Sequence, residues 1–267
     1  MNKPIRVALS GSGFRLPAHI GALEAILEAG YDIVEICGTS GGSIVAAMFA
    51  SGMSIDTMKR LALTQDWSKM LSFEFWAGVR NGGYCSGNAL LNFLSKHTAG
   101  ITFGTTKVPL KIVASDLLTE KEVVFSKAIT PTMPIALAAR ASASIPFVFV
   151  PVHYMNWLLV DGGCCDNMPA DQLLIDGTVR LGVYLVSKDP AVPIEKIGLI
   201  TMAEQVIDLL MASSEDAHSE DARITGATIV HVDTSYAGSL DTHMPLAVRQ
   251  RLIQDGHDQI AQALKLL

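Results

Sequence analysis

A serine flanked by glycines stands between a short apolar run and a segment with helical character. Residues 38–42 read GTSGG, and residues 33–37 before them (IVEIC) are mostly apolar. A G-x-S-x-G pattern between a strand and a helix is the setting of a nucleophile elbow. Gly38 and Gly42 fit where the strand and the helix leave no room for a side chain. We therefore predict that Ser40 is a nucleophile and that the start of the following helix stabilises an oxyanion.

A serine hydroxyl attacks an ester only when a base removes its proton, and the sequence offers two kinds of base. One kind is a histidine near the carboxyl end of the chain. The candidates are His218, His231, His243 and His257. Of these, His257 lies where enzymes with a Ser-His-acid triad often hold their histidine. The other kind is a carboxylate, Asp161, which ends an apolar run and begins Asp-Gly-Gly. Asp161 can serve only if burial raises its pKa and the fold brings it to the serine oxygen.

A second glycine-rich loop lies between the first predicted strand and the first predicted helix. Residues 10–15 read SGSGFR. Backbone amides of such a loop can bind an anion. The full G-x-G-x-x-G pattern and the Lys-Ser/Thr pair of a P-loop are both absent from the sequence, so a nucleotide phosphate is not favoured. In a parallel sheet this loop and the elbow open at the same edge, which suits an oxyanion hole.

The composition restricts the class of protein and its partners. The chain has 267 residues, of which 49% are hydrophobic and 17% charged, so we predict one domain over residues 1–267. The net charge of -6 and the lack of a basic run argue against nucleic acid. The four cysteines lack metal-binding spacing and are expected to be reduced; with no signal peptide in view, this predicts a cytoplasmic location. No apolar run is long enough for a transmembrane segment.

Predicted strands alternate with predicted helices, which favours an α/β layered fold with a largely parallel sheet. The predicted strands cover residues 5–10, 33–37, 107–115, 122–125, 157–160, 179–186 and 228–232. The predicted helices cover residues 16–29, 43–51, 55–63, 89–97, 134–140, 194–211 and 245–266. Prolines predict a loop over residues 144–152. The aromatic residues between Trp67 and Tyr84 suit either a lid or acyl-binding groove, or an ordinary hydrophobic cluster.

Several blocks of the sequence, in the same order, resemble the patatin-like phospholipases. Residues 9–23 (LSGSGFRLPAHIGAL) resemble the anion-binding loop of that family, and residues 38–43 (GTSGGS) resemble its elbow. Residues 161–169 (DGGCCDNMP) resemble its catalytic aspartate motif. Two connecting stretches, residues 114–126 and 139–152, are also similar. The resemblance is strong from about residue 5 to residue 169 and fainter beyond.

The resemblance implies a three-layer patatin-like fold, with a mostly parallel central sheet flanked by helices. It also implies a Ser-Asp dyad, in which Ser40 is the nucleophile and Asp161 is the base. The implied oxyanion hole consists of backbone amides of Gly11, Ser12 and Gly13, in a loop supported by Arg15. The implied activity is hydrolysis of acyl esters in phospholipids or other lipids, without a cofactor or metal. The expected partners are therefore a lipid or acyl ester substrate and, transiently, a membrane surface.

Two positions depart from the family pattern and keep other functions open. Ser12 stands where the family usually has a glycine, and Leu16-Pro17 replaces a pair that contains glycine. If the backbone at Ser12 needs a positive φ, the loop is strained, and the chain would be a non-catalytic binding protein of the same fold. His19 matches a common family residue, and we interpret it as structural. Asp166 is expected to stabilise the loop after Asp161.

Overall fold

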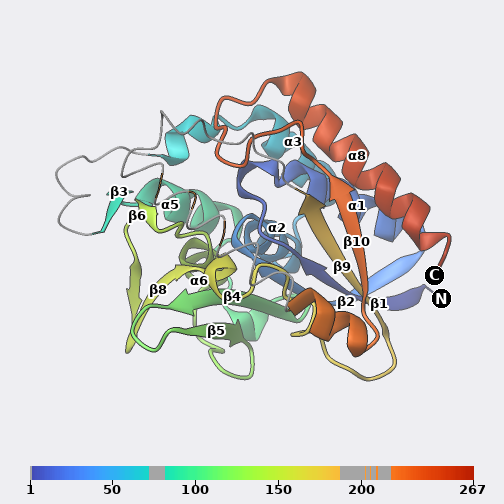
Figure 1. Cartoon of the computed structure of the whole chain (residues 1–267), viewed down its shortest axis with the longest axis horizontal. Coiled ribbons are helices and arrows are strands. Elements are labelled where there is room, and N and C mark those ends of the chain that lie inside the picture. Colours follow the sequence, from blue (N-terminus) through green and yellow to red (C-terminus); the bar gives the residue numbers. More distant parts are fainter. Residues whose placement is uncertain (1, 72–81, 187–201, 203–204, 206–208, 210–217) are drawn as a thin grey trace.

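The computed structural model describes residues 2–71, 82–186, 202, 205, 209 and 218–267. Within these residues, a sheet of eight strands lies between helices (Figure 1). Its strands are β1 (Lys3–Leu9), β2 (Tyr31–Thr39), β4 (Leu110–Asp116), β5 (Lys121–Ser126), β7 (Val152–Tyr154), β8 (Trp157–Asp161), β9 (Val179–Val186) and β10 (Thr228–Asp233). A separate pair consists of β3 (Gly83–Cys85) and β6 (Phe147–Phe149).

The sheet order is β10-β9-β1-β2-β4-β8-β7, and β5 pairs with β4 outside this path. The five strands from β10 to β4 are parallel to their neighbours, whereas β8, β7 and β5 join by antiparallel pairing. The prediction of an α/β fold with a mostly parallel central sheet is therefore confirmed.

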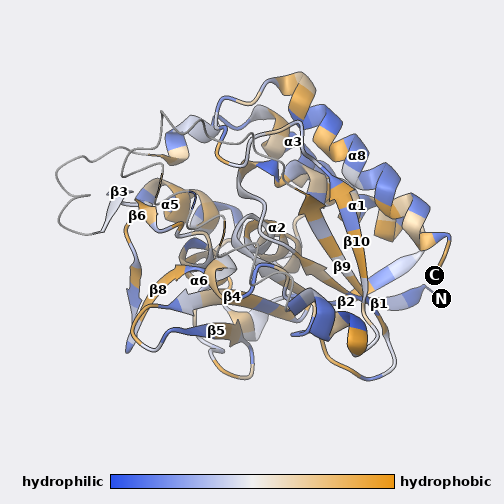
Figure 2. Ribbon diagram, in the orientation of Figure 1, coloured by the Kyte–Doolittle hydropathy of each residue, from blue (hydrophilic) through white to orange (hydrophobic). Residues whose placement is uncertain are grey.

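The helices are α1 (Pro17–Glu28), α2 (Ser40–Ala50), α3 (Ile55–Thr64), α5 (Asn88–His97), α6 (Ile135–Ser142) and α8 (Leu246–Leu264). Ser54 caps the start of α3, since its hydroxyl accepts a hydrogen bond from the Thr57 amide. The long helix α8 shows alternating hydrophobic and hydrophilic bands (Figure 2), because one face packs on α1 and the other meets solvent.

Alternate side chains of the central strands enter two separate cores, one on each face of the sheet. Val7 and Leu9 of β1 belong to the large core beneath the helices, whereas Ala8 between them belongs to the second core. The second core also contains Met168 of the segment after β8 and Ala222 of a helix over residues 218–224. The fold is thus built of three layers, as the resemblance implies.

Three features differ from the predictions or lie outside the described residues. The predicted loop over residues 144–152 contains β6 and the first residue of β7. Pro151 directly precedes β7, which is an edge strand, so a missing backbone donor is tolerated there. The predicted helix over residues 194–211 lies almost wholly outside the described residues, as do the aromatic residues of segment 72–81.

All four cysteines are free thiols. Among the described residues, no helix has the length and apolar character needed to cross a bilayer.

Candidate active site

The strand β4 brings together two chain segments that are far apart in the sequence. β5 pairs along one edge of β4, so β2 and β8 share the other edge. β2 runs parallel to β4 and ends with Thr39 opposite Val113. β8 runs antiparallel and ends with Asp161 opposite Ala114. The two strands therefore approach each other head to head, and their last residues meet beside neighbouring positions of β4.

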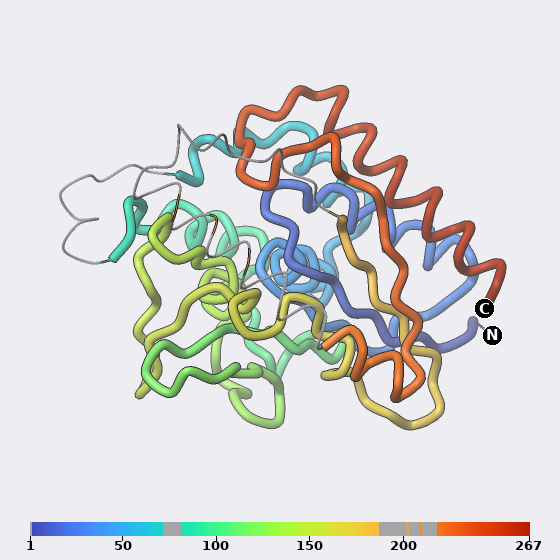
Figure 3. The backbone as a smooth tube through the Cα atoms, viewed as in Figure 1, coloured from blue at the N-terminus to red at the C-terminus, as the bar shows by residue number. Residues whose placement is uncertain are grey.

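The elbow between β2 and α2 has the backbone that the motif requires. Ser40 has a φ of 49°, which is a strained value for a residue with a side chain. A Cβ on Gly38 would lie 2.7 Å from the carbonyl oxygen of Gly42, and a Cβ on Gly42 would lie 2.4 Å from that of Leu9. Both positions therefore admit only glycine. Figure 3 shows that the chain enters α2, seen end-on, at the centre of the molecule.

The Ser40 hydroxyl donates a hydrogen bond of 2.7 Å to Oδ2 of Asp161. The other oxygen of Asp161, Oδ1, accepts from the Gly163 amide at 2.9 Å. Burial raises the pKa of Asp161 to about 7, although these two hydrogen bonds lower it. The Ser40 amide donates to Oγ of Ser142 on α6 at 2.8 Å, which links the elbow to that helix. A carboxylate with this pKa is partly ionised at neutral pH and can accept a proton.

The glycine-rich loop lies directly against the elbow. A Cβ on Gly41 would lie 2.3 Å from Oγ of Ser12 and 3.0 Å from the amide nitrogen of Gly13. Gly13 has a φ of 54°, and a Cβ there would lie 2.1 Å from the carbonyl oxygen of Ser239. The amides of Ser12 and Gly13 donate to no described residue, whereas the Gly11 amide donates to the Asn167 carbonyl at 3.0 Å. Of the three predicted oxyanion donors, the Ser12 and Gly13 amides thus have no described acceptor, whereas the Gly11 amide already has one.

Neither departure from the family pattern occupies a position that requires glycine. Ser12 has a φ of -150°, so this position does not need a positive φ. Pro17 occupies the first turn of α1, where a proline needs no amide donor. The Arg15 side chain donates to the Ser12 carbonyl at 3.2 Å and reaches the Val186 carbonyl and the Thr234 hydroxyl, so it fastens the loop to the end of β9.

The candidate histidines have their polar contacts elsewhere. His257 contacts Glu28 and Asp258 at 2.9 Å each on the outside of α8, and His218 contacts Asp171. The Nε2 atom of His19 donates to the Ser10 carbonyl at 2.9 Å, and burial lowers the pKa of this histidine to about 3, which fits a structural role. His231 contacts Arg223, and His243 contacts the Thr242 hydroxyl. The side chain that hydrogen-bonds the Ser40 hydroxyl is therefore a carboxylate and not an imidazole.

A pocket lined almost wholly by apolar side chains opens beside Ser40. Its walls include Phe14, Ile44, Trp67, Leu90, Val148 and Leu240. Trp67 also packs edge-on against Phe93, with ring centroids 5.6 Å apart. Both interpretations of the aromatic segment thus apply to this residue, because it joins a hydrophobic cluster and also faces the pocket.

Two contacts of the site were not predicted from the sequence. The Ser142 hydroxyl under the Ser40 amide has no pattern that marks it, since it lies in an alanine-rich helix. The Thr39 hydroxyl donates to the Asp166 carbonyl at 2.9 Å, which links the elbow to the segment after β8. The position of Asp166 close to Asp161 in the sequence was the only signal for this link.

The fold and the elbow define a class of α/β proteins with a serine on a tight strand-to-helix turn. The sequence matches the family model described as patatin-like phospholipase over residues 7–174, which is more than half of the chain. The chain belongs to the patatin-like phospholipase family.

Relatives and solved structures agree with this membership. The chain is 34% identical over 175 residues to protein R571 of Acanthamoeba polyphaga mimivirus, covering 61% of this chain and 59% of that protein. It is 32% identical over 170 residues to the NTE family protein Rv1063c of Mycobacterium tuberculosis, covering 62% and 44%. The chain thus matches only about half the length of these relatives. The crystal structure of VipD from Legionella pneumophila matches 99% of this chain and 67% of its own, with a TM-score of 0.65 at 17% identity, which shows the shared fold.

Proposed function

We propose that this chain is a serine lipid acyl hydrolase of phospholipase A type, in which Ser40 and Asp161 form a catalytic dyad. The observation that carries the proposal is the hydrogen bond of 2.7 Å from the Ser40 hydroxyl to a fully buried carboxylate. Family membership supports a lipid as the substrate class. The mycobacterial relative is named as an NTE family protein, and this name does not identify a substrate for the present chain.

The proposed reaction has two halves. Ionised Asp161 accepts the Ser40 proton while Oγ attacks the ester carbonyl carbon, and the negative charge that develops on the carbonyl oxygen is stabilised by the Ser12 and Gly13 amides. Each such donor contributes about 3 kcal/mol to transition-state stabilisation. The protonated Asp161 then returns its proton to the leaving alcohol, and a water molecule repeats the sequence on the acyl-enzyme.

The apolar pocket beside Ser40 suits the acyl chain of the substrate. Its Phe14, Trp67 and Val148 walls offer no charge to a polar substrate, and burial of methylene groups there would provide binding energy of about 0.8 kcal/mol per group. The glycine-rich loop lies at the same pocket through Gly13, so a bound ester would have its carbonyl near the oxyanion donors.

The test compares four forms of the chain with mixed lipids and a short acyl ester. Mass spectrometry of the lipid products identifies the substrate, and the short ester gives rates. We expect Ser40→Ala and Asp161→Asn each to lower hydrolysis at least about 10³-fold, and His257→Gln to leave it unchanged. Loss of activity in His257→Gln with retention in Asp161→Asn would instead support a Ser-His-acid triad.

Three further statements stay predictions. The chain is expected to act as a single domain, to contact a membrane surface only transiently, and to be located in the cytoplasm. The alternative of a non-catalytic binding protein rested on strain at Ser12, and the φ of -150° at that residue gives it no support.

A further inference from the structure

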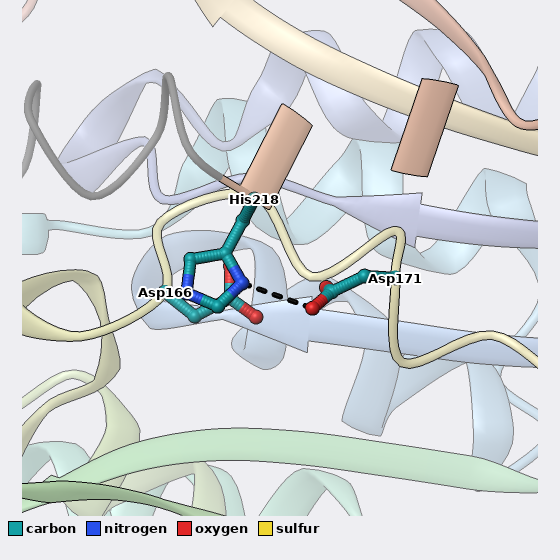
Figure 4. Close-up of side chains that lie close together, drawn as sticks. All are labelled: Asp166, Asp171 and His218. Atoms are coloured by element: carbon teal, nitrogen blue, oxygen red, sulfur yellow. Dashed lines mark hydrogen bonds and ion pairs between the residues drawn. The ribbon is translucent and has the colours of Figure 1, made fainter. Parts of the chain in front are cut away.

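Three ionisable side chains converge on the face of the sheet opposite to α1 and α8. Asp166 and Asp171 come from the segment after β8, and His218 lies in the helical segment over residues 218–224 (Figure 4). One ligand atom from each residue lies within 4.8 Å of the others. The Nδ1 atom of His218 lies 2.9 Å from Oδ2 of Asp171 and 3.9 Å from Oδ1 of Asp166. Neither carboxylate takes part in the proposed chemistry at Ser40.

The hydrogen bonds of this cluster are incomplete. Asp166 is fully buried; its Oδ1 accepts from the Met168 amide at 3.0 Å, and its Oδ2 accepts from no described residue. The Oδ1 atom of Asp171 is likewise buried and has no described partner. A buried carboxylate oxygen without a donor is costly, and native structures usually supply a proton, a water or a cation.

The spacing of these atoms is close to that of the ligands of a divalent ion. Two tetrahedral ligands about 2.1 Å from a zinc ion are about 3.4 Å apart. The separations from His218 Nδ1 are 2.9 Å and 3.9 Å, and the two carboxylates lie within 4.8 Å of each other, so a bound ion would replace the hydrogen bond between His218 and Asp171 and draw the ligands slightly inward. Two carboxylates and a neutral imidazole around a divalent ion also form a group with no net charge. Such a group suits a buried location better than the same residues without a cation.

We propose that Asp166, Asp171 and His218 form a binding site for a divalent transition-metal ion, with Zn²⁺ as the best fit. The imidazole ligand disfavours Ca²⁺ and Mg²⁺, which prefer six or more oxygen ligands, and favours Zn²⁺. Three protein ligands leave a fourth position for water.

The role of the ion would be to hold the segment after β8 in place. The Asp166 carbonyl accepts from the Thr39 hydroxyl, and the Asn167 carbonyl accepts from the Gly11 amide. The same segment thus contacts both the elbow strand and the glycine-rich loop. An ion that joins it to helix 218–224 would stabilise the rear of the candidate active site without touching the substrate.

The experiment measures zinc binding and thermal stability, neither of which depends on the proposed hydrolysis. Cys164 and Cys165 are free thiols that can bind zinc, so all measurements use a Cys164→Ser, Cys165→Ser background. In that background, calorimetric titration with ZnCl₂ alone should give one ion per chain. Saturating zinc should raise Tm by about 5 °C or more, and MgCl₂ at the same concentration should give no such rise.

Two ligand variants and one matched control decide the assignment. Asp171→Asn and His218→Gln should each weaken zinc binding at least tenfold and abolish the rise in Tm, whereas His257→Gln should preserve both. His257 is the matched control because it also lies between two carboxylates, but these contact opposite ring nitrogens and cannot share one ion. Circular dichroism of each metal-free variant reports whether it has folded. Zinc binding at full strength in His218→Gln, or its absence in the parent chain, would overturn the proposal.

Discussion

At the scale of single residues, the properties of the site follow from the burial of one carboxylate. Asp161 is fully buried, and its two hydrogen-bond donors, the Ser40 hydroxyl and the Gly163 amide, are both uncharged. Burial therefore dominates and raises the pKa of Asp161 to about 7. Exposed aspartates are ionised far below neutral pH and are weak bases, so this environment is what would let Asp161 deprotonate a serine.

The first residue-scale prediction concerns the pH dependence of hydrolysis. The base is active when ionised, so kcat/KM should fall about tenfold per pH unit below the Asp161 pKa of about 7 and level off above it. The measurement is a pH-rate profile of the parent chain with a short uncharged ester. An undiminished rate at pH 5 would show that Asp161 is not the base.

A second prediction concerns the hydroxyl beneath the elbow. Ser142→Ala removes the acceptor of the buried Ser40 amide and leaves that donor unsatisfied, so the free energy of unfolding should fall by about 1–3 kcal/mol. The rate of hydrolysis should fall as well, because the elbow loses a contact that fixes it. The control is Ser51→Ala, which removes a hydroxyl that donates to the Met48 carbonyl near the end of α2. Equal stability and rate in both variants would contradict the proposed contact.

At the scale of elements, the sequence predicts the local motifs of the site better than it predicts the contact between Ser40 and Asp161. The elbow and the glycine-rich loop have local signatures, since tight turns demand glycine at fixed positions. The approach of Ser40 to Asp161 depends on β2 and β8 sharing an edge of β4, and no spacing along the chain encodes that pairing. Family resemblance supplied this pairing, whereas the residues alone left histidine and aspartate open. The Ser142 contact and the Asp166–His218 cluster also depend on tertiary packing, so they were missed.

The element-scale prediction tests the position of the glycine-rich loop with two glycines of positive φ. Gly13→Ala should lower hydrolysis at least tenfold, because its Cβ would meet the Ser239 carbonyl oxygen and displace the loop amides from Ser40. Gly30→Ala should keep the activity, because its Cβ meets nothing within 4 Å. Gly30→Ala should lose about 1–2 kcal/mol of stability through backbone strain, and Gly13→Ala should lose more, because its Cβ also meets backbone atoms of Ser239. Rates that fall equally in both variants, or in neither, would contradict this position of the loop.

At the scale of the whole molecule, helix α1 near the start of the chain packs against helix α8 near its end. A Cβ on Gly21 of α1 would lie 1.9 Å from the Ile253 carbonyl oxygen, and a Cβ on Gly256 of α8 would lie 2.0 Å from that of Ala18. The backbones of the two helices are therefore in direct contact where they cross. This packing fixes the position of α1, which follows the glycine-rich loop in the sequence. The energy of this packing must also offset the cost of burying Asp161.

The whole-molecule prediction concerns that cost. The pKa of Asp161 is higher in the folded chain than in the unfolded chain, so its contribution to stability is present at low pH and is lost as the pH rises through about 7. Asp161→Asn should therefore raise Tm relative to the parent chain, and by more at pH 8 than at pH 5. Thermal unfolding at both pH values provides the measurement. A variant that is less stable than the parent at pH 8 would contradict the direction of the pKa shift.

The most direct test of the central claim is the labelling of Ser40 by a fluorophosphonate, followed by intact-mass spectrometry and peptide mapping. The dyad predicts one adduct per chain, located on Ser40, in the folded parent at pH 8. It predicts labelling at least about 10²-fold slower in Asp161→Asn and at the parent rate in His257→Gln. Absence of labelling in the folded parent, or labelling of Asp161→Asn at the parent rate, would contradict a serine activated by this aspartate.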